Sequence, residues 1–420
     1  LAVKPNRGSS LMVFRQFVPA LLVLWLAGCG NFLELRKELK EADSRLGRIS
    51  GTVRSPDCER CPTILVALGD TEGKKVHTYR VMDHPEAFDM VTLGDSRYVF
   101  GFNDLNNDFQ FQADEPSGWL RLPENFSAGK RFNGIELVLK HQAADAAPAF
   151  GNLFSLRGKT LGMIDVRLGS LADLSDARFD QDLAALGMWQ PLRFMKEGYS
   201  GIYFLEPFTP EKIPVLFVHG INGSPRDFSA LISRLDREKF QPWVIYYPSG
   251  LEIGALGDGM LGMLTEIHHR YRFKHLNVVA HSMGGLVTRS YLGACARNDD
   301  CAYLLSFVSI SSPFGGHSAA QSGVDYSPVV VPAWRSMAPN SPFLRQLFNQ
   351  PLPGQLPHHL IFGFRTAGII SATSGDGTIT LASQLRQEAQ HQAASQRGFD
   401  EDHMSILGSG PVIDYINEWL

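Results

Sequence analysis

The chain has 420 residues, of which 44% are hydrophobic and 20% charged, and its formal net charge at pH 7 is −4. This composition is typical of a globular protein of two or three domains, without low-complexity runs or internal repeats. Because there is no basic excess, nucleic acid is not an expected partner.

The first segment, residues 1–29, has the pattern of an export signal. From Met12, one early basic residue, Arg15, precedes an apolar run over residues 17–27. That run is short for a transmembrane helix and is typical of a secretory signal. It ends in Leu-Ala-Gly-Cys at Cys29, which resembles the lipobox of bacterial lipoproteins. The resemblance implies cleavage before Cys29, lipidation of this residue and an exported, membrane-anchored protein, with the outer membrane as the expected location; the alternative is a plain signal peptide with a chance cysteine.

Four further cysteines form two local pairs, Cys58 with Cys61 and Cys295 with Cys301. An even number at short separations is typical of disulfide loops in an oxidising compartment. Half of a zinc site or a redox CxxC are the alternatives. Neither pair has histidines or a second CxxC nearby, so we predict two disulfides.

Residues 30–46 alternate charges and leucines at helical spacing, which indicates a short helix or tether. From 47 to 142 the chain consists of short β-rich runs separated by turn residues, such as TILVALGD and RYVFGFND. Strands at this spacing favour a small all-β sandwich. Their rhythm resembles the prealbumin-like modules of secreted proteins. The small-residue stretch 143–151 is the expected linker.

Inside this region, residues 104–115 imitate a calcium-binding loop. Asp104, Asn106 and Asp108 alternate along the loop, and Glu115 is its twelfth residue. An EF-hand collects oxygen ligands at these positions. Phe109 stands where the sharp turn normally has glycine, and Asp/Asn clusters are also common in hairpin loops. A structural calcium ion is therefore a side hypothesis.

From 152 to 420 the rhythm becomes α/β. Apolar runs such as KIPVLFVHG, QPWVIYYPSG and HLNVVAHS alternate with helix-like segments such as DFSALISRLDR. Strands alternating with helices predict a mostly parallel sheet with helices on both faces. Residues 160–168 and 201–208 are expected to supply the first strands, antiparallel to their neighbours.

The stretch VVAHSMGGLV places Ser282 between a predicted strand and a predicted helix. A strand, a sharp turn and a helix are the context of a nucleophile elbow, in which only small neighbours are tolerated. Ala280 and Gly284 occupy the two positions that are glycine in the strict GxSxG pattern. A tight turn with an incidental serine is the alternative.

A serine nucleophile needs a base that is held by a third group. In the α/β-hydrolase order the acid and then the histidine follow the serine. His403 lies just before the predicted terminal helix, and Asp376 lies between glycines after the strand HHLIFGFRT. We therefore predict Asp376 as the acid and His403 as the base. Asp400 and Asp402 are rivals for the acid, and surface roles are expected for His358, His359 and His391.

Donors for a transition-state oxyanion are expected after the strand VLFVHG. The N–H of Ile221 and that of Met283, the residue after Ser282, are the predicted pair. Gly220 lets the chain pass close to the substrate. His219 in this oxyanion loop and His281 precede their turns, and we expect both to orient loops through hydrogen bonds.

VHGINGSPRDF, YYPSG, AHSMGGLV, SSPFGG, MAPNSPFLRQL and the SGDGTI…DHMSI tail together resemble the α/β-hydrolase lipases and inositol-deacylase-like esterases, over residues 205–420. The resemblance implies hydrolysis of an acyl ester, of a lipid or a small molecule, by Ser282, Asp376 and His403 through an acyl-enzyme, without a cofactor. The proline-rich segment 323–357 is expected to cap the site. A thioesterase or amidase with the same residues, or a non-catalytic surface scaffold, are the alternatives.

Overall fold

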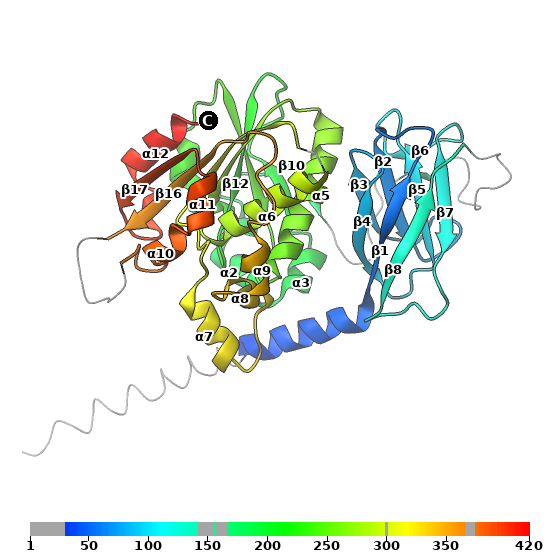
Figure 1. The fold of residues 1–420 in the computed structure, drawn as a ribbon, viewed down its shortest axis with the longest axis horizontal. Coiled ribbons are helices and arrows are strands. Elements are labelled where there is room, and N and C mark those ends of the chain that lie inside the picture. The colour runs from blue at the N-terminus through cyan, green and yellow to red at the C-terminus, as the bar shows by residue number, and fades with distance from the viewer. Residues whose placement is uncertain (1–29, 142–153, 156–165, 299–300, 366–373) are drawn as a thin grey trace, which may run out of the picture.

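Two groups of strands follow each other along the chain, and a long helix precedes them (Figure 1). The computed structural model describes residues 30–141, 154–155, 166–298, 301–365 and 374–420. Cys29 and the expected linker 143–151 therefore lie outside the described residues. None of the helices within the described ranges is long and apolar enough to cross a membrane.

The N-terminal helix covers residues 30–45 and packs on the second group of strands and its helices. Leu35 is fully buried in the large apolar core of that part. The Glu38 carboxylate accepts the backbone N–H groups of Leu192 and Arg193, at 2.6 and 3.2 Å. These N–H groups open a helix and would otherwise be unpaired. The expected short helix is thus present, and its contacts fix it to the fold.

The first group of strands forms a small β-sandwich, as predicted. Its two sheets have the strand orders β4-β1-β8 and β3-β2-β5-β7, and their facing side chains, such as Ile49 and Leu65, share one apolar core. In β4 the side chains alternate between buried and exposed, because one face of the strand packs on this core. The strands are β1 (Leu46–Arg54), β2 (Thr63–Leu68), β3 (Val76–Met82), β4 (Ala87–Leu93), β5 (Tyr98–Asn103), β7 (Ser117–Arg121) and β8 (Arg131–Val138), with β6 (Gln110–Phe111) paired to β9 (Phe154–Ser155).

The second group forms an eight-stranded sheet with the order β10-β11-β13-β12-β14-β15-β16-β17. Every pair is parallel except β11–β13, which is antiparallel. Helices on both faces give this part the predicted α/β-hydrolase fold. The strands are β10 (Arg167–Leu171), β11 (Gly201–Phe204), β12 (Ile213–Val218), β13 (Phe240–Tyr246), β14 (Leu276–His281), β15 (Leu304–Ile310), β16 (His358–Phe364) and β17 (Ser395–Asp400).

Successive residues of the central strands point into two different cores. Leu216 and Val218 of β12 face the core that includes α5 and α6, whereas Val215 and Phe217 face the core that includes α4 and α12. A central strand buried on both faces therefore has an unbroken apolar sequence. The helices are η2 (Ala177–Phe179), α2 (Gln181–Trp189), α3 (Pro191–Lys196), η3 (Pro225–Phe228), α4 (Ser229–Ser233), α5 (Ile253–Tyr271), α6 (Met283–Asn298), α7 (Ser318–Tyr326), α8 (Pro332–Met337), α9 (Pro342–Gln346), α10 (Leu381–Gln384), α11 (Gln387–Gln392), η4 (Ser405–Leu407) and α12 (Gly410–Asn417).

The edges of this sheet differ from expectation. Residues 160–165 of the first expected strand lie outside the described residues. β10, which overlaps its end, pairs in parallel with β11, so only β11 is antiparallel to its neighbour β13. β17 was not predicted, because an edge strand with one partner carries the polar sequence SQRGFD. His358 and His359 are buried in β16, which contradicts the surface role expected for them. His358 is bonded to the Ser309 hydroxyl at 2.8 Å.

The β-sandwich packs on α5 through both polar and aromatic contacts (Figure 1). The Tyr79 hydroxyl donates to the buried Glu266 carboxylate, at 2.9 Å. His269 contacts Asp83 at 2.8 Å, and the Arg270 guanidinium lies 5.2 Å from the ring centroid of Phe109. Buried polar groups with matched partners of this kind set the orientation of the two parts.

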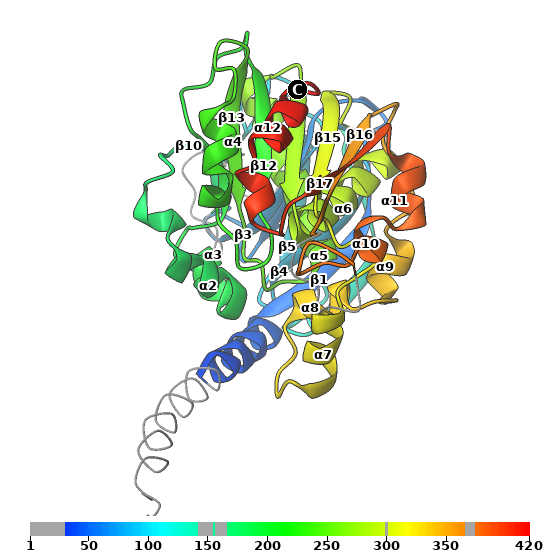
Figure 2. The ribbon, with the colours of Figure 1, turned by 90° about the vertical axis from the view of Figure 1, so that its left-hand side faces the viewer.

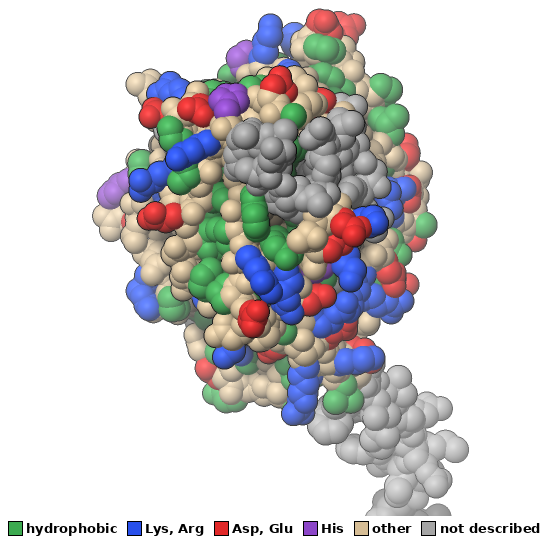
Figure 3. Space-filling view, turned by 90° about the vertical axis from the view of Figure 1, so that its right-hand side faces the viewer, with side chains coloured by type: hydrophobic (Ala, Val, Ile, Leu, Met, Phe, Trp, Pro, Cys, Tyr) green, Lys and Arg blue, Asp and Glu red, His purple; other side chains and the backbone are tan. Residues whose placement is uncertain are grey.

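On the face of the β-sandwich shown in Figure 3, acidic and basic side chains are interspersed.

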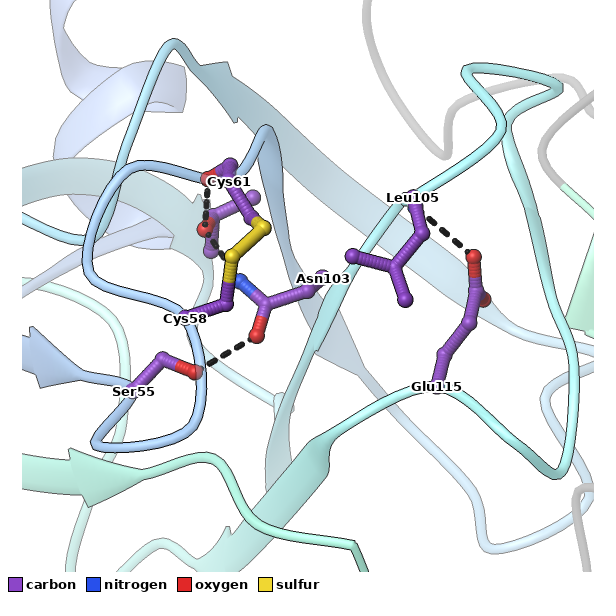
Figure 4. Close-up of a disulfide and its surroundings, with 7 residues drawn as sticks. Ser55, Cys58, Cys61, Asn103, Leu105 and Glu115 are labelled. Carbon is purple, nitrogen blue, oxygen red and sulfur yellow. Dashed lines mark hydrogen bonds between the residues drawn. A yellow bond between two sulfur atoms is a disulfide. The ribbon is translucent and has the colours of Figure 1, made fainter.

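Both expected disulfides are present. Cys58 and Cys61 close a loop with a Cα–Cα distance of 5.5 Å, and Cys295 and Cys301 close a second with 5.7 Å. Beside the first, the Ser55 hydroxyl donates to the Asn103 side chain at 2.6 Å (Figure 4).

Candidate active site

Ser282 occupies the turn between β14 and α6 in a strained backbone conformation. Its φ is +55°, in the left-handed region that a non-glycine residue rarely adopts. A Cβ added at Gly284 would lie 2.3 Å from the backbone oxygen of Val218, and one added at Gly220 would lie 3.0 Å from the Ser282 Cβ. Glycine is therefore required at both positions, one in the turn and one in the loop that packs against it. The elbow predicted from VVAHSMGGLV has the expected strand–turn–helix geometry.

Three residues from separate loops form one continuous hydrogen-bonded chain. The Ser282 Oγ lies 2.9 Å from Nε2 of His403, and Nδ1 of the same ring lies 2.7 Å from Oδ2 of Asp376. Ser282 and Asp376 are buried, and the His403 side chain is 12% exposed. The backbone N–H of His403 also donates to the backbone oxygen of Asp376, at 3.0 Å, which joins the two loops directly.

The Asp376 carboxylate is held in its charged form. Burial raises the pKa of this group, but its hydrogen bond to His403 and its electrostatic interaction with that ring lower it. The N–H groups of Thr378 and Ile379 donate to Oδ1 at 2.9 and 2.6 Å and act in the same direction. The net pKa of Asp376 lies below its ordinary value. An ionised Asp376 accepts a hydrogen bond from Nδ1–H of His403, which leaves the lone pair of Nε2 facing Ser282.

The rival acid Asp402 serves a different purpose. Its carboxylate accepts the N–H groups of Met404 and Ser405, at 3.0 and 2.7 Å, and pairs with Arg365 at 3.0 Å. It therefore caps the turn that follows His403. Asp400, the other rival, lies at the end of β17.

The two predicted oxyanion amides belong to two turns that approach the serine, since a Cβ at Gly220, next to Ile221, would lie 3.0 Å from the Ser282 Cβ. Ile221 follows β12, and Met283 begins α6. In the described turns and loops, neither N–H donates to a protein hydrogen bond, whereas the neighbouring Asn222 N–H donates to the Ser249 hydroxyl at 2.9 Å. Two amides left unpaired beside a serine hydroxyl are available to an anionic oxygen.

His219 and His281 are buried and orient loops. His219 donates from Nδ1 to the backbone oxygen of Gly220 at 2.8 Å and stacks on Tyr247 with the ring centroids 4.1 Å apart. His281 donates from Nε2 to the backbone oxygen of His403, also at 2.8 Å. Burial lowers the pKa of His219 to about 4 and that of His281 to about 3, so both rings are neutral.

Two residues beside the site were missed by the sequence analysis. Gln384 is buried, and its side-chain N–H groups donate to the backbone oxygens of Gly363 and Ile379, which braces the loop of Asp376. His317, which precedes α7, lies near enough to His403 for the charge of that ring to lower its pKa, in addition to the larger effect of burial. Neither stands in a recognisable motif, since glutamine and histidine are ordinary loop residues.

The acidic residues of the hypothetical calcium loop meet backbone amides. Asp104 accepts the N–H groups of Asp108 and Phe109, at 3.0 Å each, and Glu115 accepts those of Leu105 and Gln112, at 2.9 Å each (Figure 4). Asn106 similarly accepts the N–H of Asp108. Among the described residues, no three acidic, histidine or cysteine side chains gather as a set of metal ligands. The residues as arranged do not fit a preformed calcium cage, and calcium stays a hypothesis.

Known proteins resemble the second part of the chain. Residues 259–419 match a family described as "Alpha/beta hydrolase of unknown function (DUF915)". No curated protein matches the sequence. Among solved structures, the mature lipase BlEst2 of Bacillus licheniformis is 20% identical with a TM-score of 0.42, over 51% of this chain and 97% of that one. A putative cell surface hydrolase of Lactobacillus plantarum is 17% identical with a TM-score of 0.36, over 50% and 90% of the two chains. Phospholipase PlaB of Legionella pneumophila is 12% identical with a TM-score of 0.34, over 41% and 45%.

Proposed function

We propose that the protein is a serine hydrolase that cleaves carboxylic esters through an acyl-enzyme on Ser282. The observation that carries the proposal is the continuous chain from Ser282 Oγ through both nitrogens of His403 to Asp376. A serine hydroxyl becomes nucleophilic when a positioned base accepts its proton. The strained elbow, which exposes such a hydroxyl at the end of a strand, supports the same role.

In the proposed acylation step, the Ser282 oxygen attacks the ester carbonyl carbon while Nε2 of His403 takes the hydroxyl proton. The resulting oxyanion accepts the N–H groups of Ile221 and Met283. As the intermediate collapses, the bond from the carbonyl carbon to the alcohol oxygen breaks, and His403 gives its proton to the leaving alcohol. Throughout this step the Asp376 carboxylate stabilises the imidazolium and keeps Nδ1 protonated.

A water molecule completes the proposed cycle. His403 takes one proton from the water as its oxygen attacks the acyl carbon, and then returns a proton to the Ser282 oxygen as the acid leaves. His281 acts on both steps without touching substrate, because its hydrogen bond holds the backbone of His403 in place. All the groups in this cycle belong to the chain, so we propose no cofactor.

Apolar side chains in the expected cap and directly after the proposed base favour an acyl chain as the substrate group. The segment expected as a cap forms α7, α8 and α9, and its Val331 and Leu344 are buried in the core shared with α5. Trp334 and Phe343 of the same segment are only partly buried. Met404, directly after the proposed base, is largely exposed. A long acyl chain would cover such apolar surface from water.

The first experiment is labelling with a fluorophosphonate probe, which reacts with activated serines. The wild-type protein should be labelled and Ser282→Ala should not, while both have the same thermal unfolding midpoint. Esters of p-nitrophenol with increasing acyl length then separate a lipase-like preference from a short-chain one. A folded wild-type protein that takes no label would support the non-catalytic scaffold instead.

We also propose that the chain is exported and anchored through a lipid on Cys29. The apolar run 17–27 directly before Leu-Ala-Gly-Cys supports this proposal, as do the two disulfides. The mass of the N-terminal peptide, taken from the bacterial membrane fraction, tests it. An acylated Cys29 at the mature N-terminus is expected, with loss of anchoring in Cys29→Ser; an uncleaved or unmodified peptide would contradict the proposal.

A further inference from the structure

The two most exposed large apolar side chains of the described residues lie on two elements that both pack on Trp334 of α8. Tyr326 at the end of α7 is 85% exposed, and Leu33 in the first turn of the N-terminal helix is 65% exposed. Figure 2 shows this helix below α2, with α7 and α8 to its right, and Figure 1 shows the same neighbourhood at the lower side of the molecule. Exposed apolar groups that gather in this way are typical of an interaction surface.

Aromatic contacts join the N-terminal helix, α2, α7 and α8 along one edge of the molecule. Phe32 lies 5.2 Å from Trp189 at the end of α2 and 6.4 Å from Trp334 in α8, between ring centroids. The two tryptophan rings are 6.0 Å apart and perpendicular. A Cβ at Gly323 of α7 would lie 2.5 Å from the Trp334 ring, so α7 sits directly on it. The relative positions of Leu33 and Tyr326 are therefore set by packing.

The exposed face of the N-terminal helix is basic. Leu33, Arg36, Lys37 and Lys40 are exposed and follow the i, i+3, i+4, i+7 spacing that places residues on one side of a helix. Phe32, Leu35 and Leu39 follow the same spacing on the side that packs on the protein. Glu34 is the only acidic residue exposed in the first two turns. Apolar and basic groups on one helical face match the chemistry of an anionic lipid surface.

The chain that precedes this helix ends at the same edge. Residues 17–27 are apolar, and residue 30 opens the helix one turn before Leu33. Residue 30, to which either that apolar segment or a lipidated Cys29 is joined, opens the helix that carries Leu33. Because Cys29 directly precedes the first residue of the helix, a lipid on Cys29 would keep this edge of the molecule close to the bilayer.

The edge is also connected to the proposed catalytic residues. α7 begins after His317, and the backbone oxygen of the preceding Gly316 accepts the Ser383 hydroxyl at 2.6 Å. The next residue, Gln384, braces the loop of Asp376. The nine residues of α7 span about 13 Å, so Tyr326 stands roughly that far from the start of α7 beside the triad.

We propose that Leu33, Tyr326 and the basic face Arg36, Lys37 and Lys40 form a docking surface for an anionic lipid bilayer, which brings acyl esters of bilayer lipids to Ser282. The docking surface stands on its own contacts and charges. The substrate class, esters embedded in a bilayer, rests on the proposed function. A bilayer is favoured over a protein partner because the apolar segment 17–27 and the basic face both point to lipid.

The test uses residues 30–420, which contain every described helix and strand. Co-sedimentation is measured with vesicles of phosphatidylcholine alone and of a two-to-one mixture with phosphatidylglycerol. Leu33→Asp and Tyr326→Asp should each weaken binding to the mixed vesicles about tenfold, because each removes apolar contact and adds a negative charge. Lys37→Gln should weaken it about fivefold and have no effect on the neutral vesicles. Leu171→Asp is the matched control, since Leu171 is 58% exposed on the edge strand β10.

Hydrolysis is measured in parallel on the same vesicles and on a soluble short-chain p-nitrophenyl ester. Leu33→Asp and Tyr326→Asp should lower the vesicle rate by about the factor lost in binding. Leu33→Asp, at a position outside the expected cap, should leave the soluble-ester rate unchanged. Wild-type protein that sediments no better than the Leu33→Asp/Tyr326→Asp double variant would overturn the docking surface. Wild-type protein that binds vesicles but hydrolyses neither substrate would overturn the proposed function and leave the docking surface standing. Hydrolysis of the soluble ester only, despite binding, would overturn the assigned substrate class.

Discussion

Two buried acidic loops, one in each part of the molecule, place carboxylates against backbone amides. The pKa values of the two carboxylates are nevertheless shifted in opposite directions. In the α/β-hydrolase part, Asp376 accepts two N–H groups and also meets His403, and its pKa lies below the ordinary value. In the β-sandwich, Glu115 likewise accepts two N–H groups, but burial and the charges of Asp104 and Asp108 raise its pKa to about 7. Two amide donors alone therefore do not offset burial at Glu115, whereas the added hydrogen bond and electrostatic interaction with His403 do so at Asp376.

The largest expected effect comes from removing the charge of Asp376. Asp376→Asn keeps the size of the side chain but no longer fixes the proton on Nδ1 of His403. We expect kcat on a p-nitrophenyl ester to fall on the order of 10⁴-fold, as for a triad whose histidine takes the wrong tautomer. Asp402→Asn is the matched control, because asparagine also caps a turn well, and its kcat should stay near the wild-type value. A similar loss in both variants would mean that the acid has been assigned wrongly.

Glu115 in the β-sandwich should make the stability of the protein depend on pH. Because the pKa of Glu115 is raised from 4.5 to about 7, the folded chain binds more protons than the unfolded chain between these values. The free energy of unfolding should therefore fall as pH rises through this window, by roughly 3 kcal/mol at most, and then level off. Urea unfolding at pH 5 and pH 8 measures the difference, which should shrink in Glu115→Gln. Glu124→Gln, at an exposed surface position, serves as the control and should retain the wild-type difference.

A third prediction separates positioning of the base from chemistry. His281→Phe removes the donor to the His403 backbone while keeping a flat ring, and we expect kcat to fall about 10²-fold through misplacement of His403. His281→Gln, which restores an N–H donor, should recover part of that loss. KM for a short ester should stay within about threefold, because the residue does not touch substrate. A drop in thermal stability with unchanged kcat would limit His281 to a structural role.

The smallest effect concerns calcium binding to the loop of residues 104–115. If a calcium ion supplies a positive charge next to Glu115, calcium should raise the unfolding midpoint of the wild-type protein by a few degrees at pH 8, where Glu115 is ionised. At pH 5, with Glu115 protonated, the rise should be smaller. Asp104→Asn and Glu115→Gln should abolish it. An equal midpoint with calcium and with a chelator would remove the calcium hypothesis.

Much of the fold and of the candidate site could be predicted from local sequence patterns. The central strands of the α/β sheet are buried on both faces, so their unbroken apolar sequences were readable, whereas the polar edge strand β17 was not. Ser282 was found because its elbow is a local structure: strand, turn and helix are consecutive in the chain. Asp376 and His403 were chosen by their order and by the loops that carry them, and the structure brings both to the serine.

What the sequence by itself determined is the set of elements with strong local signals: the apolar strands, the elbow at Ser282 and the short cysteine loops. Only the tertiary structure decided which polar groups meet, because residues more than a hundred positions apart, such as His281 and His403, become neighbours only when the sheet assembles. The same holds for the charge state of buried carboxylates. The sequence marks Asp376 and Glu115 alike as acids in turns, but their pKa values move in opposite directions, since burial and the nearest charge are properties of the folded chain.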